Sequence, residues 1–354
     1  MKSITKKVFI GMDVHRKNYV LCCVVDGVIV KRCQMQPRFA NVIGFIKKHF
    51  AGYEVSTVYE AGFSGFELHR ALEGAGFNSI VVHPAAVEVS NRDRKVKTDK
   101  RDAKKLAIQL AAGRLKGIRI PSRKEEQRRQ LTRTREQIIE HRSAIKNQIR
   151  SKFHIFSLLD PDDARELSLV MVDQILSKVE IEELKIAIGS LRAVWVSYNE
   201  QLKVLQASLR EQAKSDPLDK TYRSVPGFGP LASRILSNEL GDLQHFKSCK
   251  DLYSFTGLTP GEHSSGDNIH RNNITRQGSA RLRHILVQAA WVAIRLDKGL
   301  REDFERIAKK GNKLKAIVAI ARKLIGRARA LFRDNVLYEP RNCSATSQSA
   351  TAQA

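Results

Sequence analysis

The sequence predicts an α/β N-terminal domain, a central region of long helices and a mostly helical C-terminal domain. Three patterns support this prediction. Short β-branched runs alternate with helical segments early in the chain, apolar residues recur at helical spacing through the middle, and a helical pattern interrupted by a Gly- and Pro-rich stretch follows. At 354 residues the chain is long enough for more than one domain, each with its own core.

The N-terminal strands are β-branched runs separated by short polar breaks. They occupy residues 8–14, 19–25 and 28–35, and Asp26-Gly27 is a tight-turn signal between the second and the third. Strands are also expected at 55–60 and 79–82, and the helical segments are 40–50, 66–74 and one that begins near residue 98. Three strands joined by hairpins, then alternating helix and strand, is the order of a ribonuclease-H-like domain, a mixed sheet with helices packed on it.

The chain has a large positive excess, with 62 Lys and Arg against 37 Asp and Glu and a net charge of +25. Such an excess favours a nucleic-acid partner, because neutralised phosphates release counterions; ribosomal association or simple solubility is the alternative. Residues 91–153 hold 21 basic and 7 acidic residues, and 127–150 is predicted to form one basic helix. We expect this helix to lie along a phosphate backbone through Arg128, Arg135 and Arg142, although a solvated face is also consistent with the pattern.

Apolar residues recur at alternating spacings of three and four between positions 181 and 209, which indicates a long helix with a coiled-coil seam. The seam has two explanations. It packs on the 127–150 helix within the chain, or it pairs two copies of the chain. We favour self-association, so a homo-oligomer, either a dimer or a tetramer, is predicted. The seam consists of Ile181, Leu184, Ile188, Leu191, Trp195, Tyr198, Leu202, Leu205 and Leu209.

The sequence shows no apolar stretch of signal-peptide or membrane-span length, so no membrane partner is expected. We therefore expect a cytoplasmic protein of a bacterial or archaeal cell, associated with the nucleoid. The five cysteines are odd in number and lack metal-binding spacing, which argues against a zinc site and against a disulfide framework.

Four carboxylates stand where a ribonuclease-H-like sheet would bring acids together: Asp13, Glu60, Asp99 and Asp102. Asp13 interrupts an apolar strand, which is costly unless it is paired, and Glu60 ends the fourth strand, which lies beside the first in this fold. Asp99 and Asp102 share one face at a helix start. Taken singly, Asp99 also fits a helix N-terminus and Glu60 a solvated strand end. Together they predict a divalent-cation site, with Mg²⁺ as the cofactor, because clustered carboxylates repel one another without a hard cation.

The segment SVPGFGPLASRILSNEL at 224–240 is typical of a helix-hairpin-helix-like element. Gly227 and Gly229 would let the backbone approach a phosphate, and the amides of the following helix N-terminus favour an anion. A plain connection between two helices is the alternative.

A polar stretch containing Ser264, Ser265 and Gly266 precedes a helix that carries Arg281 and Arg283. A serine hydroxyl needs activation to act as a nucleophile, and guanidiniums can bind a phosphate through two hydrogen bonds. Ser-Ser-Gly is equally typical of a turn, so the spacing alone leaves both roles open.

Taken together, these motifs resemble the insertion-sequence family numbered one-ten, transposases with a DEDD acidic domain and a serine-bearing C-terminal domain. The resemblance covers residues 7–335 and rests on GMDVH, YEAG and TDKRDAKKLA in the first half, and on PGFGP, FTGLTP and ITRQGSARLRHILVQAAW in the second. The chain departs from the family pattern at Asn273, Arg276 and Ser279, where glycine, lysine and asparagine are usual.

The resemblance implies a Holliday-resolvase-like fold whose acids bind Mg²⁺, and a C-terminal serine that attacks DNA and forms a transient phosphoserine link. Carried over, this nucleophile falls on Ser265, with Ser264 as its rival. The family also implies a structured guide RNA from the same element, which pairs with donor and target DNA. The expected activity is therefore site-specific DNA strand cleavage and exchange by phosphoryl transfer.

We expect four regions in the chain: a catalytic domain with the basic helix at 1–155, a coiled-coil linker at 156–220, a serine transposase domain at 221–335 and a disordered tail at 336–354. Two rival functions remain. One is a metal-dependent Holliday-junction-type endonuclease without a covalent intermediate, and the other is a non-catalytic nucleic-acid-binding protein on a degenerate version of the fold.

Overall fold

The computed structural model describes residues 6–88, 99–265, 268–275 and 277–340. The chain divides into two compact units, Met1–Pro121 and Ser122–Ala354. Each unit has its own hydrophobic core.

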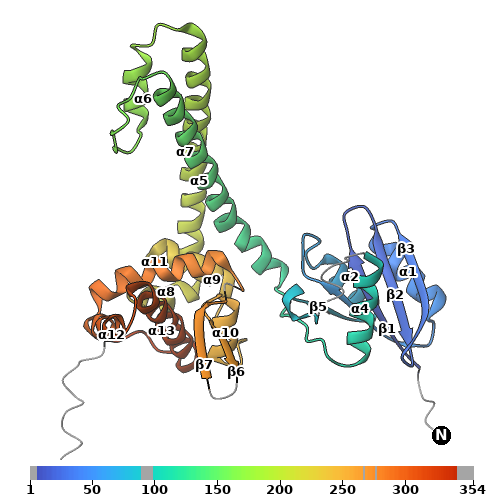
Figure 1. The fold of residues 1–354 in the computed structure, drawn as a ribbon. Helices are drawn as coiled ribbons and strands as arrows, with labels where there is room; N and C mark the ends of the chain where they lie inside the picture. Colours follow the sequence, from blue (N-terminus) through green and yellow to red (C-terminus); the bar gives the residue numbers. More distant parts are fainter. Residues whose placement is uncertain (1–5, 89–98, 266–267, 276, 341–354) are drawn as a thin grey trace, which may run out of the picture. The chain divides into compact units, whose positions relative to one another are not determined.

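The first unit is built on a five-stranded mixed sheet with the order β3-β2-β1-β4-β5 (Figure 1). Its strands are β1 (Lys7–Val14), β2 (Tyr19–Val25), β3 (Val28–Met35), β4 (Glu54–Glu60) and β5 (Asn78–Val82). The first three strands form antiparallel pairs, whereas β4 runs parallel to both β1 and β5. The tight turn predicted at Asp26-Gly27 is present, and both residues have positive φ.

Helices cover both faces of this sheet. Helix α1 (Phe39–His49) and helix α2 (Glu67–Gly74) pack on one face, and α4 (Asp99–Ala111) packs on the other; the short η1 (Pro84–Ala86) follows β5. Because β1 and β2 have buried residues on both faces, they read as nearly continuous apolar runs, whereas the edge strand β3 alternates between exposed and half-buried residues. In β2 all residues but the last are buried, which explains why the sequence predicted this sheet well.

The second unit begins with two long helices that pack against each other, α5 (Arg123–Ile155) and α7 (Glu182–Ser215). Ser122 caps α5 with its side chain, and Glu125 completes a capping box. The short α6 (Leu169–Leu176) covers the end of the pair where α5 stops and α7 starts, around a core that includes Phe153 and Trp195.

The coiled-coil seam on α7 is used within the chain. Five seam residues are buried, while the first, Ile181, is about half exposed and precedes the helix. The structure therefore shows the intramolecular explanation, in which the seam packs on α5, and not the self-association that we favoured. Oligomerisation through another surface stays a prediction. The buried residues of the seam are Leu184, Ile188, Trp195, Leu202 and Leu209.

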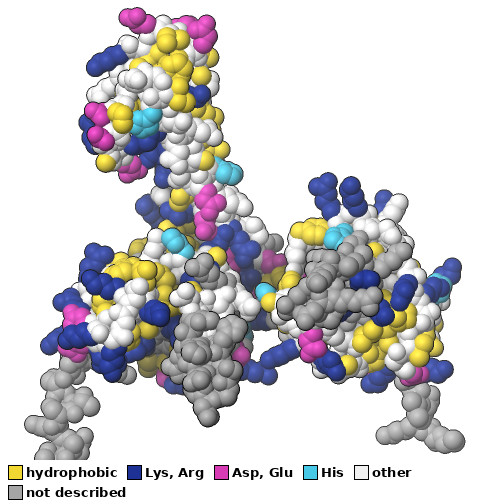
Figure 2. All heavy atoms as spheres, viewed as in Figure 1, with side chains coloured by type: hydrophobic (Ala, Val, Ile, Leu, Met, Phe, Trp, Pro, Cys, Tyr) yellow, Lys and Arg dark blue, Asp and Glu magenta, His cyan; other side chains and the backbone are white. Residues whose placement is uncertain are grey.

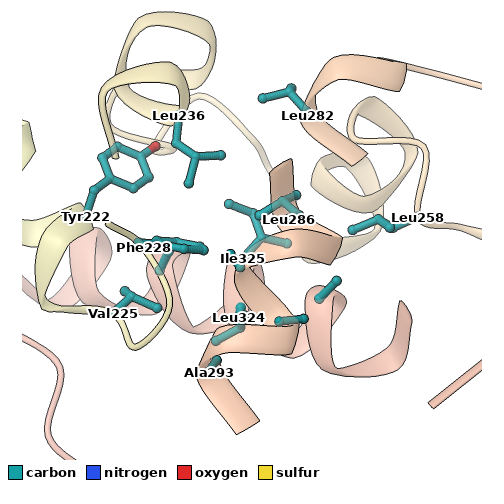
Figure 3. Packing of buried hydrophobic residues seen from close by; sticks show 14 of the residues in the cluster. Tyr222, Val225, Phe228, Leu236, Leu258, Leu282, Leu286, Ala293, Leu324 and Ile325 are labelled. Atoms are coloured by element: carbon teal, nitrogen blue, oxygen red, sulfur yellow. The ribbon is translucent and has the colours of Figure 1, made fainter. Parts of the chain in front are cut away.

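The remaining helices form the C-terminal part of the second unit around one large core (Figure 3). Tyr222, Phe228, Leu236 and Leu286 converge there from different elements and are almost fully buried. The helices are α8 (Pro217–Ser224), α9 (Pro230–Leu240), α10 (Cys249–Phe255), α11 (Ala280–Leu296), α12 (Lys298–Lys309) and α13 (Lys313–Asp334). A two-stranded antiparallel sheet of β6 (Pro260–Ser265) and β7 (Asn268–Ile274) is inserted between α10 and α11.

Two expected boundaries differ from the structure. The basic helix α5 belongs to the second unit, because it packs on α7 and α9, so the division falls at Pro121 rather than at residue 155. The tail does not begin at 336: Tyr338 donates a hydrogen bond of 2.6 Å to Asp297, and its backbone amide donates to Ser224. Residues 341–354 lie outside the described part of the chain. None of the helices in the described ranges is both long and apolar enough to cross a membrane.

Candidate active site and nucleic-acid interface

Asp13 and Glu60 lie at the carboxyl ends of two neighbouring parallel strands. In the β1–β4 register Met12 is the partner of Tyr59, so Asp13 and Glu60 each follow a paired residue by one position. Met12 and Tyr59 are buried in the core beneath α1 and α2. Because side chains alternate along a strand, Asp13 and Glu60 point to the opposite face, which α4 covers.

Helix α4 crosses that face in contact with β1. A Cβ on Gly11 would lie 2.2 Å from the carbonyl oxygen of Ala103, so only glycine allows this approach. Phe9, earlier on the strand, lies with Ala111 at the end of α4. The helix therefore runs opposite to β1, and its first turn points toward Asp13.

This first turn carries the other two predicted acids. Asp102 immediately precedes Ala103, and its half-buried carboxylate lies 2.9 Å from the Lys105 ammonium. Asp99 is the first residue of α4, although its side chain lies outside the described part of the structure. The fold thus brings the backbone positions of all four acids to one edge and one face of the sheet.

Asp13 has a hydrogen-bonding neighbour just past the end of β1. The Nε2 atom of His15 lies 3.2 Å from Oδ2 of Asp13, whose side chain is 18% exposed. An acid this poorly solvated at the end of an apolar strand is costly without a hydrogen-bond partner. The contact was not predicted, although the spacing of the two residues puts them on one face of the strand.

The donor set fits a hard divalent cation, since Asp13, Glu60 and Asp102 contribute only carboxylate oxygens. Among the described side chains, no group of three or more His, Cys, Asp or Glu residues is already arranged around one point. Asp99, the fourth member of the predicted set, was not part of that search because its side chain is not described. The edge of the sheet therefore carries ligands of a suitable type, on secondary-structure elements that converge.

The serine motif lies at the end of β6, one strand of the two-stranded antiparallel sheet. Ser264 and Ser265 are the last residues of β6, and Ser265 pairs with Asn268 of β7. Their side chains, and residues 266–267, lie outside the described part of the chain. The sequence signal was weak because β6 and β7, with sequences PGEHSS and NIHRNNI, have few β-branched or aromatic residues.

The base of this hairpin is tightly packed. A Cβ on Gly278 would lie 2.4 Å from the Ser254 carbonyl oxygen, and one on Gly257 would lie 2.3 Å from the Arg283 guanidinium; both glycines have positive φ. Arg283, one of the two predicted phosphate clamps, thus lies at the root of the hairpin that carries Ser265, within 3.5 Å of the Gly257 carbonyl oxygen.

Arg281, the other predicted clamp, has an intramolecular partner. Its guanidinium lies 2.5 Å from the Glu136 carboxylate of α5, and its side chain is 22% exposed. A phosphate at this position would have to compete with Glu136.

The segment for which we predicted a helix-hairpin-helix-like element consists of α8, a short loop and α9. Its two glycines differ in role. Gly227 has a φ of +84°, and a Cβ there would lie 2.1 Å from the Ala289 carbonyl oxygen, so it allows the loop to pack on α11. Gly229 is the exposed N-cap residue of α9 with nothing within 4 Å of a Cβ, so it is the glycine with room for a phosphate.

Several basic residues of α5 are committed to packing. Arg133 forms two hydrogen bonds of 2.8 Å with the buried Glu239 of α9, and this contact raises the pKa of Arg133. Arg129 donates to the carbonyl oxygens of Asn238 and Glu239 at the end of α9. The charge pattern alone could not separate these anchoring residues from residues that are available to a nucleic acid.

The three α5 arginines that we predicted as phosphate contacts are half-buried, not fully exposed. Arg142 donates to Asn199 of α7 at 3.1 Å. Burial, reinforced by the nearby charge of Arg142, lowers the pKa of Arg135. A role for Arg135 and Arg142 in binding phosphates stays a prediction. For Arg128 the structure shows only that its backbone carbonyl accepts from Asn238.

Charge is unevenly distributed along the helix pair. Residues 156–183, around the end that α6 covers, contain eight acidic and two basic residues, and acidic side chains are visible there in Figure 2. Helix α5 itself carries basic residues along its whole length, and Lys146 pairs with Glu166 near this acidic end.

A buried ion pair that the sequence did not predict joins α7, α8 and α9. Arg234 is 2% exposed and donates to Asp216, the N-cap residue of α8, and Ser237 donates to the same carboxylate at 2.6 Å. Burial alone would raise the pKa of Asp216, but these hydrogen bonds lower it. For Asp219, 3.8 Å from Arg234 without a hydrogen bond, burial prevails and raises the pKa.

Comparison with known proteins gives two matches to family models. Residues 10–156 match a transposase family whose name combines DEDD and IS110, and residues 219–305 match the transposase family IS116/IS110/IS902. These matches place the chain among the IS110-type transposases. All four predicted acids lie within the first match, and the serine motif lies within the second.

Individual relatives of this IS110-type chain span most of its length. A protein of Sinorhizobium fredii that is provisionally named a transposase is 29% identical over 76% of this chain and 74% of its own. The transposase for insertion sequence element IS1533 of Leptospira borgpetersenii is 26% identical over 81% and 85%. The transposase for element IS1111A of Coxiella burnetii is 22% identical over 81% and 78%.

Proposed function

We propose that this IS110-type transposase cleaves and exchanges DNA strands site-specifically, with an acidic metal site on the first unit and Ser265 as the nucleophile. The observation that carries the proposal is the convergence at the sheet edge. Asp13 and Glu60 end adjoining parallel strands on one face, and the acidic first turn of α4 packs over that same face. Carboxylates on converging elements are the type of ligand that holds the cations commonly used in phosphoryl transfer.

In this proposal Asp13, Glu60, Asp99 and Asp102 hold Mg²⁺. When bound, the cation supplies positive charge that offsets the negative charge on a phosphate undergoing displacement. The chain itself contributes rigidity: Gly11 fixes the height of α4 above β1, and Lys105 and His15 orient the Asp102 and Asp13 carboxylates. These contacts hold the acids near one another before DNA binds.

The proposed chemistry at Ser265 is a reversible transesterification. The serine oxygen forms a bond to phosphorus, and the bond between phosphorus and one sugar oxygen breaks. The serine proton passes to a base and the departing sugar oxygen takes one up, so no proton is lost overall. Attack by another sugar hydroxyl reverses these changes and joins a new strand, without an energy source.

Arg283 is the proposed phosphate contact at this step, because it lies at the root of the hairpin that ends in Ser265. Arg281 is a second candidate, which would exchange Glu136 for a phosphate oxygen. Arg135 and Arg142 on α5, with Gly229 at the start of α9, are proposed contacts to the nucleic-acid backbone.

We also propose a structured RNA from the same element as the source of site selection, and a homo-oligomeric assembly. The RNA follows from the resemblance noted in the sequence motifs. The chain supports this proposal indirectly. Its basic surface suits contacts with a phosphate backbone, and such contacts do not depend on the nucleotide sequence.

The test is a search for a covalent protein–DNA adduct with the full-length chain and Mg²⁺, using element-end DNA together with the flanking non-coding RNA. Wild type should form an adduct that denaturant does not dissolve. Ser265→Ala should abolish the adduct, Ser264→Ala should leave it, and Asp13→Asn should reduce it strongly. Strand cleavage without an adduct in wild type would instead establish the metal-dependent endonuclease. Full activity in Asp13→Asn would exclude the acidic site.

A further inference from the structure

The turn between α12 and α13 has an unusual concentration of positive charge. Residues 309–315, with the sequence KKGNKLK, are all exposed and include four lysines and no acid. We call Lys309, Lys310, Lys313 and Lys315 the lysine turn. The family match in the C-terminal region ends at residue 305, so this surface lies outside the part that the family describes.

None of these four lysines forms an ion pair or a side-chain hydrogen bond with any residue that the structure describes. Neighbouring basic residues do. Arg306 lies 2.6 Å from Asp303, Lys323 pairs with the same carboxylate, and Lys298 lies 4.0 Å from Glu302. The lysine turn therefore carries charge that the protein itself does not neutralise.

The position of the turn makes this charge more costly for the folded chain. Lys313 and Lys315 occupy the first turn of α13, a helix of 22 residues, and this first turn has no acidic residue. Helix N-termini carry partial positive charge and favour acids, so two lysines here are unfavourable. Lys309 and Lys310 end the preceding helix, where the helix dipole favours cations, and they raise the positive charge of the turn. An anionic partner would relieve this repulsion.

The chemistry of the turn indicates which anion it suits. Lysine ammonium groups on flexible stems bind phosphates as point charges, without reading bases. The turn has no aromatic residue on which an unpaired base could stack. Phe304, on the preceding helix, is half-buried and packs on Trp291 at 5.7 Å between ring centroids.

We propose that the lysine turn is a second DNA-binding surface, which contacts the phosphate backbone of duplex DNA without regard to sequence. This proposal rests on the proposed function only in taking DNA as the polyanion. It adds a contact that is separate from the serine hairpin and from the acidic edge, and that involves none of the residues assigned to the chemistry.

The test measures how the affinity of the full-length protein for a duplex without element sequence depends on salt. The quadruple variant K309Q/K310Q/K313Q/K315Q is compared with wild type. Each lost phosphate contact reduces the slope of log K against log salt by about 0.9, so we expect a reduction of about 2 to 3.6. Relative to about 1 M salt, this corresponds at about 0.1 M salt to binding weaker by roughly 100- to 4,000-fold.

A matched control separates a specific surface from net charge. The variant K178Q/K185Q/K203Q/K250Q removes four lysines that are also exposed and have no ion pair with a described residue, but that are scattered over the unit. It should change the slope by less than a third as much. Melting temperature checks folding and should stay constant or rise in the lysine-turn variant, because two charges at the start of α13 are removed.

Three results would overturn the proposal: equal effects in the two quadruple variants, no effect in either, or weaker binding to an RNA duplex of the same sequence with binding to DNA unchanged. The last result would assign the turn to RNA. The assay uses no cleavage step. A failure of Ser265 as nucleophile would therefore leave this measurement intact, and the two proposals can fail separately.

Discussion

Replacing Gly11 with alanine should separate α4 from the strand that carries Asp13. A Cβ at this position would lie 2.2 Å from the Ala103 carbonyl oxygen and 2.4 Å from the Ala107 amide nitrogen, both backbone atoms. Since Cβ contacts are essentially never shorter than 3.0 Å, the helix must retreat by at least the difference, about 0.8 Å. Neither atom can be moved by a change of side-chain rotamer.

The expected cost has two parts. Overpacking of this kind typically destabilises by about 1–3 kcal/mol. A displacement of about 1 Å at Asp102 should also lower the yield of covalent adduct on the order of 10²-fold, because the proposed metal ligand on α4 would move away from Asp13 and Glu60. Calorimetric unfolding and the adduct assay measure the two effects independently.

Gly44→Ala is the matched control. Gly44 lies inside α1 of the same unit, and nothing stands within 4 Å of a Cβ there. Alanine should stabilise that helix by about 0.5–1 kcal/mol and leave DNA processing unchanged. If Gly11→Ala has the melting temperature and the adduct yield of wild type, α4 does not contact β1 as described. The proposal that the acids converge at this edge would then lose its basis.

Two further predictions concern the second unit. Gly227→Ala should destabilise the protein by about 1–3 kcal/mol in calorimetric unfolding, because its Cβ would clash with the α11 backbone at a residue with positive φ. Gly229→Ala should fold normally and weaken DNA binding in a gel-shift assay. Equal stability of the two variants would contradict the packing role of Gly227. Asp216→Asn should destabilise by about 3–5 kcal/mol near neutral pH, since it leaves Arg234 buried without its charged partner. The pKa of Asp216 is lowered in the folded chain, so its contribution is present above its ordinary value of 3.8 and is lost as pH falls through the folded value. The free energy of unfolding of wild type should therefore fall in that acid range, while that of the variant changes less. If urea titrations show the same fall for both proteins, Asp216 does not have this role.

The first unit could be predicted closely from the sequence. Its strands have buried residues on both faces, so the apolar runs and the Asp26-Gly27 turn marked them clearly. The convergence of Asp13 and Glu60 followed from the strand order. Few strand orders are compatible with three hairpin-connected strands followed by a parallel crossover. The contact between Gly11 and α4 was not foreseen, because glycine within a strand indicates a close approach without showing which element approaches.

The second unit was harder to predict because its determining contacts are between residues far apart in the sequence. Arg129 and Arg133 looked like the other basic residues of their helix, and their structural role comes from contacts with Asn238 and Glu239, more than a hundred positions away. We predicted that Gly227 lets the backbone approach a phosphate, because its packing partner, Ala289, is also distant in the sequence. The β6–β7 hairpin escaped prediction because its sequence is polar and lacks strand-forming residues.

The α5–α7 pair also has a mechanical consequence. With 33 and 34 residues at about 1.5 Å per residue, each helix is roughly 50 Å long, and a tilt of about 5° at one end moves the other by about 4 Å. The pair is fastened near one end, where Arg133 meets Glu239 and Asp216 meets Arg234. A small change in the angle of the helices at these charge pairs would therefore displace the acidic end by several ångströms.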